Sequence, residues 1–232
     1  MSKTSEGKLF QTGAVGLAAI LLYAIATMIL LPILGAQPET AEDCLEMLHT
    51  HRIVGLIRLD LLTVLIMPVF YPVYFAVYHA MREVAAPFPL FWLLLLFAGV
   101  TLFLATPSAL SLSSLSDQYY AAETEQARAG IAAAAKAILS SDMWHMTGAV
   151  TGSLLTQIAG IGLSVLMMRS PVFGKRLGLL GVITHSLDLA HFIAYILAME
   201  TLSTVLIGIA GVLYLPLYGW MAVRLRRAGE AA

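Results

Sequence analysis

Six runs of mainly apolar residues, each long enough to cross a bilayer as a helix, dominate this sequence. A membrane-spanning helix needs about 20 consecutive apolar residues, because the hydrocarbon core is ~30 Å thick and a helix rises ~1.5 Å per residue. The runs lie near residues 10–35, 54–80, 88–114, 143–168, 177–198 and 201–223. We therefore predict an all-α polytopic membrane protein, with residues 1–232 forming a single transmembrane domain built as a six-helix bundle.

The composition agrees with this prediction and excludes several classes of soluble protein. Of the 232 residues, 59% are hydrophobic and 12% are charged, whereas soluble domains are about 25% charged. The net charge of −1 offers no basic surface for a nucleic acid. Cys44 is the single cysteine, so the chain can form neither an internal disulfide nor a cysteine-based zinc cluster. The partner that this composition predicts is the lipid bilayer.

The first apolar run resembles a secretory signal peptide only superficially. Lys3 and Lys8 precede it, and the residues LGA before Gln37 mimic a cleavage site. The run is about 25 residues long, however, whereas the apolar region of a signal peptide has about 7–15 residues. We expect an uncleaved transmembrane helix.

The basic residues predict the orientation of the protein in its membrane. With six spans, nine of the Lys and Arg residues that flank them fall on one side and three on the other. The nine are Lys3, Lys8, Arg82, Arg169, Lys175, Arg176, Arg224, Arg226 and Arg227, and the three are Arg52, Arg128 and Lys136. Because basic residues concentrate on the cytoplasmic side, both termini are predicted to be cytoplasmic.

Two connecting segments on the opposite side are long enough to fold. The first, residues 36–52, is acidic and carries His49 and His51. The second, residues 116–141, is rich in alanine and contains no proline. Alanine has the highest helix propensity, so we expect this segment to be helical.

Small residues recur at every fourth position of the fourth run. They are Gly148, Gly152, Thr156, Gly160 and Ser164. A ridge of small residues lets another helix approach closely and gain van der Waals contact. The partner is either another helix of the same bundle, which we favour because a polytopic chain supplies one, or a second copy in a homodimer through Gly148, Gly152, Thr156 and Gly160.

The fifth run contains the polar residues that most need an explanation. On a helix, Thr184, Asp188, His191 and Tyr195 lie within about 60° of one another, and His185 lies at the edge of this stripe. An aspartate at the bilayer centre costs about 2.5–3.5 kcal/mol. The stripe should therefore face the bundle interior, where Asp188 and a histidine either form a structural pair or belong to a functional site.

Further polar residues lie at similar depth in other runs. The second run carries Arg58 and Asp60 in its outer third, and the fourth begins with Asp142 and His145. Asp142 also suits a helix-capping role, and Arg58 is close enough to the surface to reach water. We predict an outward-facing polar cavity lined by Asp60, His145, Asp188 and His191. The secondary candidates are His185, Thr184, Tyr195, Arg58 and Asp142.

Two stretches give the chain a resemblance to a known family. They are LDLLTVLIMPVFYPVYFAVYHAMR at 59–82 and MRSPVFGKRLGLLGVI at 168–183, the second following a span entered from an alanine-rich segment. The chain resembles the small bacterial membrane proteins grouped as domain of unknown function 4386, over most of its length and in the same order. The resemblance implies a six-helix protein of the bacterial cytoplasmic (inner) membrane, and it implies no reaction.

These patterns support one leading functional hypothesis and three rivals. The leading hypothesis is a non-enzymatic protein whose polar cavity binds, senses or conducts a small solute, a proton or a lipid headgroup, with no cofactor. The first rival is an intramembrane zinc-dependent hydrolase with His145, Asp188 and His191 as ligands. The others are haem ligation by two histidines on facing helices, and an accessory or assembly subunit whose polar groups only pair helices.

The spacing of the fifth-run histidines limits the zinc hypothesis. His185 and His191 are six residues apart, which separates them by about 120° around the helix and about 9 Å along it. One metal ion cannot take both from a regular helix. A metal site would need ligands from other helices.

Overall fold

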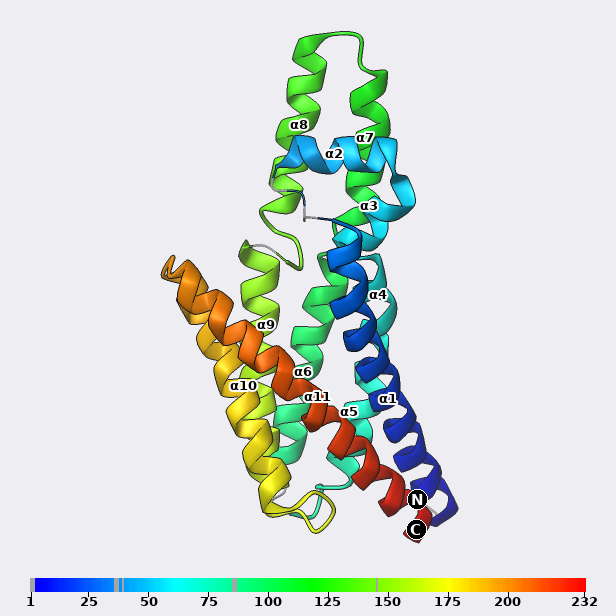
Figure 1. The fold of residues 1–232 in the computed structure, drawn as a ribbon. Coiled ribbons are helices and arrows are strands. Elements are labelled where there is room, and N and C mark those ends of the chain that lie inside the picture. Colours follow the sequence, from blue (N-terminus) through cyan, green and yellow to red (C-terminus); the bar gives the residue numbers. More distant parts are fainter. Residues whose placement is uncertain (1–2, 36–37, 39, 85–86, 145) are drawn as a thin grey trace. The chain divides into compact units, whose positions relative to one another are not determined.

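The computed structural model describes residues 3–35, 38, 40–84, 87–144 and 146–232, and the secondary structure in these ranges is helical throughout (Figure 1). The helices are α1 (Lys3–Ile33), α2 (Ala41–Thr50), α3 (Arg52–Leu59), α4 (Leu61–Ile66), the short 3₁₀ helix η1 (Met67–Val69), α5 (Phe70–His79), α6 (Phe88–Ala105), α7 (Ala109–Ala121), α8 (Glu125–Leu139), α9 (Met146–Met167), α10 (Gly174–Ile196) and α11 (Glu200–Ala231). The predicted all-α fold class is confirmed.

Within the described ranges, six helical segments are long and apolar enough to span a membrane. They are Thr4–Ile33, Leu61–His79, Phe88–Ala121, Thr147–Met167, Gly174–Ile196 and Glu200–Ala231. Each corresponds to one run predicted from the sequence. The protein is therefore a polytopic membrane protein that contacts the lipid bilayer.

Two spans differ in detail from the predicted continuous helices. Residues 54–59 belong to the separate helix α3, and Asp60 lies at the junction where α3 ends and α4 begins. The third span is interrupted between α6 and α7, where Pro107 lies. Proline lacks the backbone N–H that continues a helix. By the same argument Pro216 would interrupt the sixth span, but it lies inside the continuous helix α11.

The chain forms two compact units. Unit 1 comprises Met1–Ala24, Pro68–Val100 and Ser153–Ala232. Unit 2 comprises Ile25–Met67 and Thr101–Gly152. Unit 1 therefore contains α5, α10, α11 and most of α9, whereas unit 2 contains α2, α3, α4, α7 and α8.

In unit 1, glycines bring helix backbones close together. A Cβ atom added at Gly13 or Gly16 of α1 would lie 2.5 Å from Ala76 or Val73 of α5, closer than packed atoms tolerate. The two ends of the chain also meet, because a Cβ at Gly7 would lie 3.0 Å from the carbonyl oxygen of Gly229 (Figure 1). Both termini therefore lie at the same end of unit 1, as an even number of spans requires.

Unit 2 contains a small helical core outside the long spans. In Figure 1, α2 crosses α7 and α8, and buried apolar side chains from α2, α3, α7 and α8 pack together there. These are Ala41, Cys44, Leu45, Leu48, Leu59, Ala109, Leu112 and Ala135. The side chain of Thr40 and that of Asp43 cap the first turn of α2 reciprocally. The predicted helicity of residues 116–141 is confirmed, as the end of α7 followed by α8.

The small-residue ridge of α9 packs against neighbours in this chain. A Cβ at Gly152 would lie 3.1 Å from the Phe103 ring in unit 2, and one at Gly160 would lie 2.5 Å from Nδ1 of His185 in unit 1. Cβ atoms added at Gly178 and Gly181 of α10 would overlap the carbonyl oxygen and the hydroxyl of Ser164, respectively. These contacts fit the favoured interpretation of the ridge as an internal packing surface.

Candidate functional site

A cluster of four polar side chains lies inside unit 1, on three helices. Gln157 comes from α9, His185 and Asp188 come from α10, and Tyr214 comes from α11. His185 and Asp188 are three residues apart, so the helix places them on neighbouring positions of one face. Gln157, His185 and Asp188 are 9%, 5% and 6% exposed. These three side chains are therefore buried, and Tyr214 is partly buried.

The Tyr214 hydroxyl is the centre of this cluster. It lies 2.8 Å from Oδ2 of Asp188, 2.9 Å from Oε1 of Gln157 and 3.2 Å from Nδ1 of His185. Nδ1 of His185 also lies 2.7 Å from Oε1 of Gln157. Four groups from three helices thus share one set of hydrogen bonds.

The number of available protons limits how these bonds are made. A tyrosine hydroxyl has one proton to donate, yet that of Tyr214 faces both the Asp188 carboxyl and the Gln157 carbonyl. If Asp188 is protonated, it donates to Tyr214, Tyr214 donates to Gln157, and His185 donates to the same carbonyl, so every contact joins a donor to an acceptor. If Asp188 is ionised, Tyr214 donates to it, and Gln157 must turn its amide NH₂ toward Tyr214 and His185. Nδ1 of His185 then accepts, which requires the imidazole proton on Nε2.

The second carboxyl oxygen of Asp188 is unsatisfied. Oδ1 is buried and has no hydrogen-bond partner in the described structure. Leaving a buried polar atom unpaired costs about 1–3 kcal/mol, so native proteins keep few of them. An unpaired oxygen of this kind can accept a proton or a ligand without displacing an existing bond.

Neighbouring residues hold the cluster in position. Gly160 of α9 leaves room for the His185 imidazole, and the fully buried Thr184 bonds its hydroxyl to the carbonyl of Leu180 at 2.8 Å. The rings of Tyr214 and Tyr218 stack with centroids 5.2 Å apart, and Tyr218 hydrogen-bonds Tyr74 of α5. Thr184, a secondary candidate, therefore bonds within its own helix rather than within the cluster.

The predicted polar stripe of α10 divides along its length. Asp188 bonds Tyr214 instead of His191, whose Nδ1 lies 2.8 Å from the Ser203 hydroxyl and 3.0 Å from the Ser203 carbonyl oxygen. Tyr195 is 39% exposed. The histidine that joins Asp188 is His185, which the helical projection placed at the edge of the stripe.

A second polar cluster lies in unit 2, where α6 ends and α7 begins. Oδ2 of Asp60 accepts the backbone N–H groups of Ser108 and Ala109, at the first turn of α7. The Ser108 hydroxyl lies 3.0 Å from Asp60 and 2.9 Å from Asp142. Oδ1 of Asp142 accepts the backbone N–H of Trp144 at 2.9 Å. Both carboxylates therefore hold backbone in place, in keeping with the capping role considered for Asp142.

The remaining candidates are placed as follows. Arg58 lies on α3, and its Nε atom is buried without a hydrogen-bond partner. His145 lies outside the described residues. Among the residues described, Asp60 and Asp142 belong to unit 2, whereas Asp188 and His191 belong to unit 1. The cavity predicted to join Asp60, His145, Asp188 and His191 stays a prediction.

Three metal-binding side chains do not converge anywhere in the described part of the chain. The residue types considered were His, Cys, Asp and Glu. The zinc hypothesis includes His145, which lies outside the described residues, so the hypothesis stays a prediction. The cluster around Tyr214 supplies one carboxylate and one imidazole.

Sequence reasoning overlooked Gln157, Tyr214 and Ser108. Gln157 carries an amide in the middle of an apolar span, and such a polar group is itself a signal. It was hidden by the ridge of small residues around it. Tyr214 and Ser108 had no distinguishing signal, since tyrosines and serines are common in such spans.

A comparison with protein-family models, curated proteins and solved structures finds no match.

Proposed function

We propose that this protein is a non-enzymatic membrane protein in which Asp188 binds and releases a proton, and so senses or conducts protons or couples them to a small solute. The observation that carries this proposal is the pairing of Tyr214 with Asp188, Gln157 and His185 while Oδ1 of Asp188 is unpartnered. An ionisable group inside a membrane span is costly, and such groups line proton and ion pathways.

The two hydrogen-bond arrangements explain how the proton is exchanged. With Asp188 protonated, its proton, that of Tyr214 and that of His185 all have acceptors. When the proton leaves Asp188, Tyr214 turns its hydroxyl proton to the carboxylate, and the Gln157 amide turns by half a revolution to donate to Tyr214 and to Nδ1 of His185. The His185 proton moves to Nε2, so that Nδ1 becomes an acceptor. Gln157 can do this because one end of its amide accepts and the other donates.

This rearrangement needs no movement of the helix backbones. A bistable hydrogen-bond network of this kind lets a protonation event change side-chain orientation on α9 and α11. The outward-facing cavity through which the proton would arrive also belongs to the proposal.

The cellular setting is proposed together with the function. The asymmetry of nine basic residues against three supports cytoplasmic termini. The resemblance of residues 59–82 and 168–183 to the domain of unknown function 4386 family supports a bacterial cytoplasmic (inner) membrane. Membership of that family is part of the proposal.

Infrared difference spectroscopy of the protein in lipid bilayers tests the proposal. A protonated carboxyl group has a carbonyl stretch that vanishes when the group ionises. We expect one such band to disappear as the pH is raised, to be missing in Asp188→Asn, and to shift in frequency in Tyr214→Phe, where its hydrogen-bond partner is gone. Proteoliposomes loaded with a pH-sensitive dye test whether Asp188→Asn also abolishes proton flux.

Glu200→Gln is the matched control, because Glu200 is an exposed carboxylate at the start of α11. It should leave the titrating band unchanged. The proposal would be contradicted if Asp188→Asn retained the titrating carbonyl band of the wild-type protein. It would also be contradicted if Asp188 did not change its protonation state between acid and alkaline pH.

Elemental analysis and an absorption spectrum separate the rival cofactor hypotheses. Zinc near one atom per chain would support a hydrolase, and a Soret band would support haem. We expect neither zinc nor a Soret band in purified protein that shows the titrating band of Asp188.

A further inference from the structure

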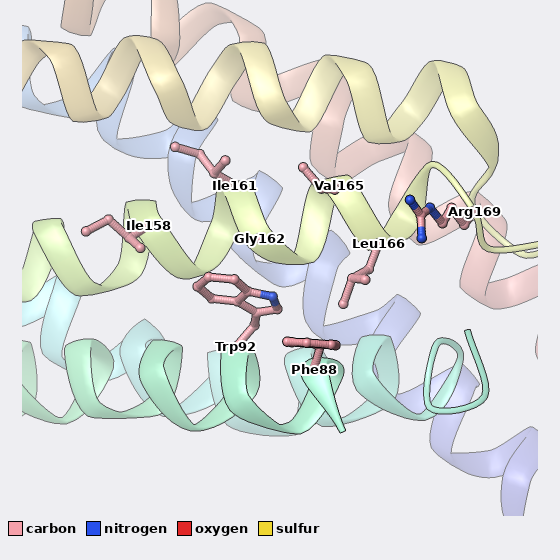
Figure 2. Close-up of a pocket in the computed structure, with 8 residues that line it drawn as sticks. All are labelled: Phe88, Trp92, Ile158, Ile161, Gly162, Val165, Leu166 and Arg169. Carbon is pink, nitrogen blue, oxygen red and sulfur yellow. The ribbon is translucent and has the colours of Figure 1, made fainter. Parts of the chain in front are cut away.

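A groove on unit 1 lies between the start of α6 and the second half of α9. It has a volume of about 460 Å³, within the range of small-molecule sites. Its lining is Phe88, Trp92, Ile158, Ile161, Gly162, Val165, Leu166 and Arg169 (Figure 2). Phe88 is 58% exposed, and Ile158 and Val165 are each 40% exposed, so the groove opens to the surface of the molecule.

The floor of the groove depends on one glycine. Trp92 lies over Gly162, and a Cβ atom added there would overlap the indole ring. Any larger residue would push Trp92 out into the groove. The sequence thus keeps the indole seated against α9 and leaves the space above it free.

The length of the groove matches one leaflet of a bilayer. Its lining along α9 and the turn that follows extends from Ile158 to Arg169, and eleven steps of ~1.5 Å give about 16 Å. Half of a ~30 Å hydrocarbon core is about 15 Å. Because the walls belong to membrane-spanning helices, the molecules available to fill them are lipid acyl chains.

The groove ends at a positive charge. Seven of its eight lining residues are apolar or glycine, and the eighth, Arg169, lies at one end of the row (Figure 2). Arg169 is the second residue after the end of α9, which is also the end of the candidate span. A guanidinium is always charged and binds phosphate oxygens through paired N–H groups. The groove therefore has an apolar body and a cationic end at headgroup level.

A second hollow of about 480 Å³ adjoins the first. It is lined by Pro87, Phe88, Leu90, Phe91, Trp92 and Leu94, and so it shares Phe88 and Trp92 with the groove. Two apolar hollows that meet at one aromatic edge can each hold one chain of a two-chain lipid.

We propose that this groove is a binding site for an anionic phospholipid, with an acyl chain along α9, the indole of Trp92 against that chain, and the headgroup phosphate on Arg169. The site goes beyond the proton exchange proposed above and uses none of the same side chains. Basic residues near the membrane surface favour anionic over zwitterionic lipid by about fivefold each. The bound lipid belongs to the leaflet on the Arg169 side.

Quenching of tryptophan fluorescence by brominated lipids tests this proposal on the full-length protein. The signal of Trp92 is the difference between the wild-type protein and Trp92→Phe, since Trp144 and Trp220 also emit. We expect brominated phosphatidylglycerol to quench Trp92 at about one fifth of the mole fraction that brominated phosphatidylcholine needs. Arg169→Gln should remove this preference, and Arg169→Lys should retain most of it.

Arg176→Gln is the matched control, because Arg176 is an exposed arginine outside the groove on the same predicted side of the membrane. It should keep the preference. Equal quenching by the two lipids in the wild-type protein would overturn the proposal, as would loss of the preference in Arg176→Gln. If Arg169→Gln does not fold, the wild-type comparison and Arg169→Lys decide the result.

Discussion

The two buried carboxylate clusters of this protein use aspartate in different ways. In unit 2, Asp60 accepts two backbone N–H groups and a serine hydroxyl, and Asp142 accepts another backbone N–H. In unit 1, Asp188 accepts one side-chain hydroxyl, and its other oxygen is unpaired. Backbone donors are fixed by the helix that carries them, whereas a tyrosine hydroxyl can rotate.

A structural carboxylate and a carboxylate able to change its protonation state differ in the donors around them. Asp60 accepts two backbone N–H groups in the first turn of α7, so it anchors the start of that helix. Asp188 has partners that can be satisfied in either protonation state. Both residues are buried to a similar degree, 2% and 6% exposed, so burial alone would not have separated them.

The largest expected effect comes from making the same substitution in both clusters. Asp60→Ala leaves the backbone N–H groups of Ser108 and Ala109 without their acceptor, and we expect the free energy of unfolding to fall by about 3 kcal/mol. Asp188→Ala should cost about 1 kcal/mol, since Tyr214 retains Gln157 as an acceptor. Denaturation in detergent, followed by circular dichroism, measures both. Equal losses would mean that the two clusters do not differ as described.

The next effect concerns the glycine that makes room for the unit 1 cluster. Gly160→Ala would force the His185 ring to move, and we expect a loss of about 2 kcal/mol despite the higher helix propensity of alanine. Gly208→Ala is the control, because a Cβ at Gly208 meets no atom within 4 Å. That variant should be neutral or slightly stabilising. A Gly160→Ala protein as stable as the wild type would show that His185 is loosely held.

Cys44 tests how tightly unit 2 is closed. Burial, together with the smaller effects of the Asp142 and Asp43 charges, raises the pKa of the Cys44 thiol from 9.0 to about 12. Since reagents attack the thiolate, three pKa units should slow alkylation of native Cys44 at pH 8 about a thousandfold relative to the unfolded chain. Mass spectrometry after timed labelling measures this, and rapid native labelling would contradict a closed unit 2.

The sign of the accompanying pH effect follows from the raised pKa. The folded state favours the neutral thiol, so this contribution to stability is complete below pH 9 and declines as the pH rises toward 12. Cys44→Ala should lose less stability than the wild type over that interval. Parallel pH profiles for the two proteins would show that the thiol does not contribute.

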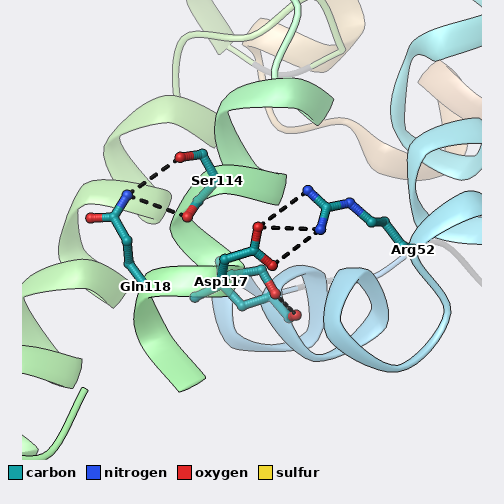
Figure 3. Close-up of polar contacts among 6 residues, drawn as sticks. Arg52, Ser114, Asp117 and Gln118 are labelled. Atoms are coloured by element: carbon teal, nitrogen blue, oxygen red, sulfur yellow. Dashed lines mark hydrogen bonds and ion pairs between the residues drawn. The ribbon is translucent and has the colours of Figure 1, made fainter. Parts of the chain in front are cut away.

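The smallest effect is expected at a surface ion pair of unit 2. Arg52 and Asp117 form hydrogen bonds of 3.2 Å through both guanidinium NH₂ groups (Figure 3). Their side chains are 54% and 58% exposed, so water screens the pair. Arg52→Gln should cost about 0.5 kcal/mol, and less at high salt. A loss as large as that of Asp60→Ala would mean that this pair, and not the buried carboxylates, holds unit 2 together.

Much of the fold could be predicted because the bilayer imposes a strong local rule. Every backbone polar group inside the hydrocarbon must bond within its own helix, so length and hydropathy alone predicted the six spans. Helicity at residues 116–141 followed from the alanine content for an equally local reason. The break at Asp60 was not predicted, since the hydrogen bond that Asp60 accepts there comes from Ser108, 48 positions away along the chain.

The candidate site shows the same division between local and long-range information. The sequence by itself determined that Asp188 lies inside a span and needs an explanation, since the cost of a carboxylate in hydrocarbon is independent of its neighbours. Only the tertiary structure decided that its partners are Tyr214, His185 and Gln157. Residues 157 and 214 are 57 positions apart, and no periodicity within a helix specifies which faces of α9, α10 and α11 meet. That choice depends on side-chain packing between helices, to which glycines such as Gly160 and Gly181 contribute.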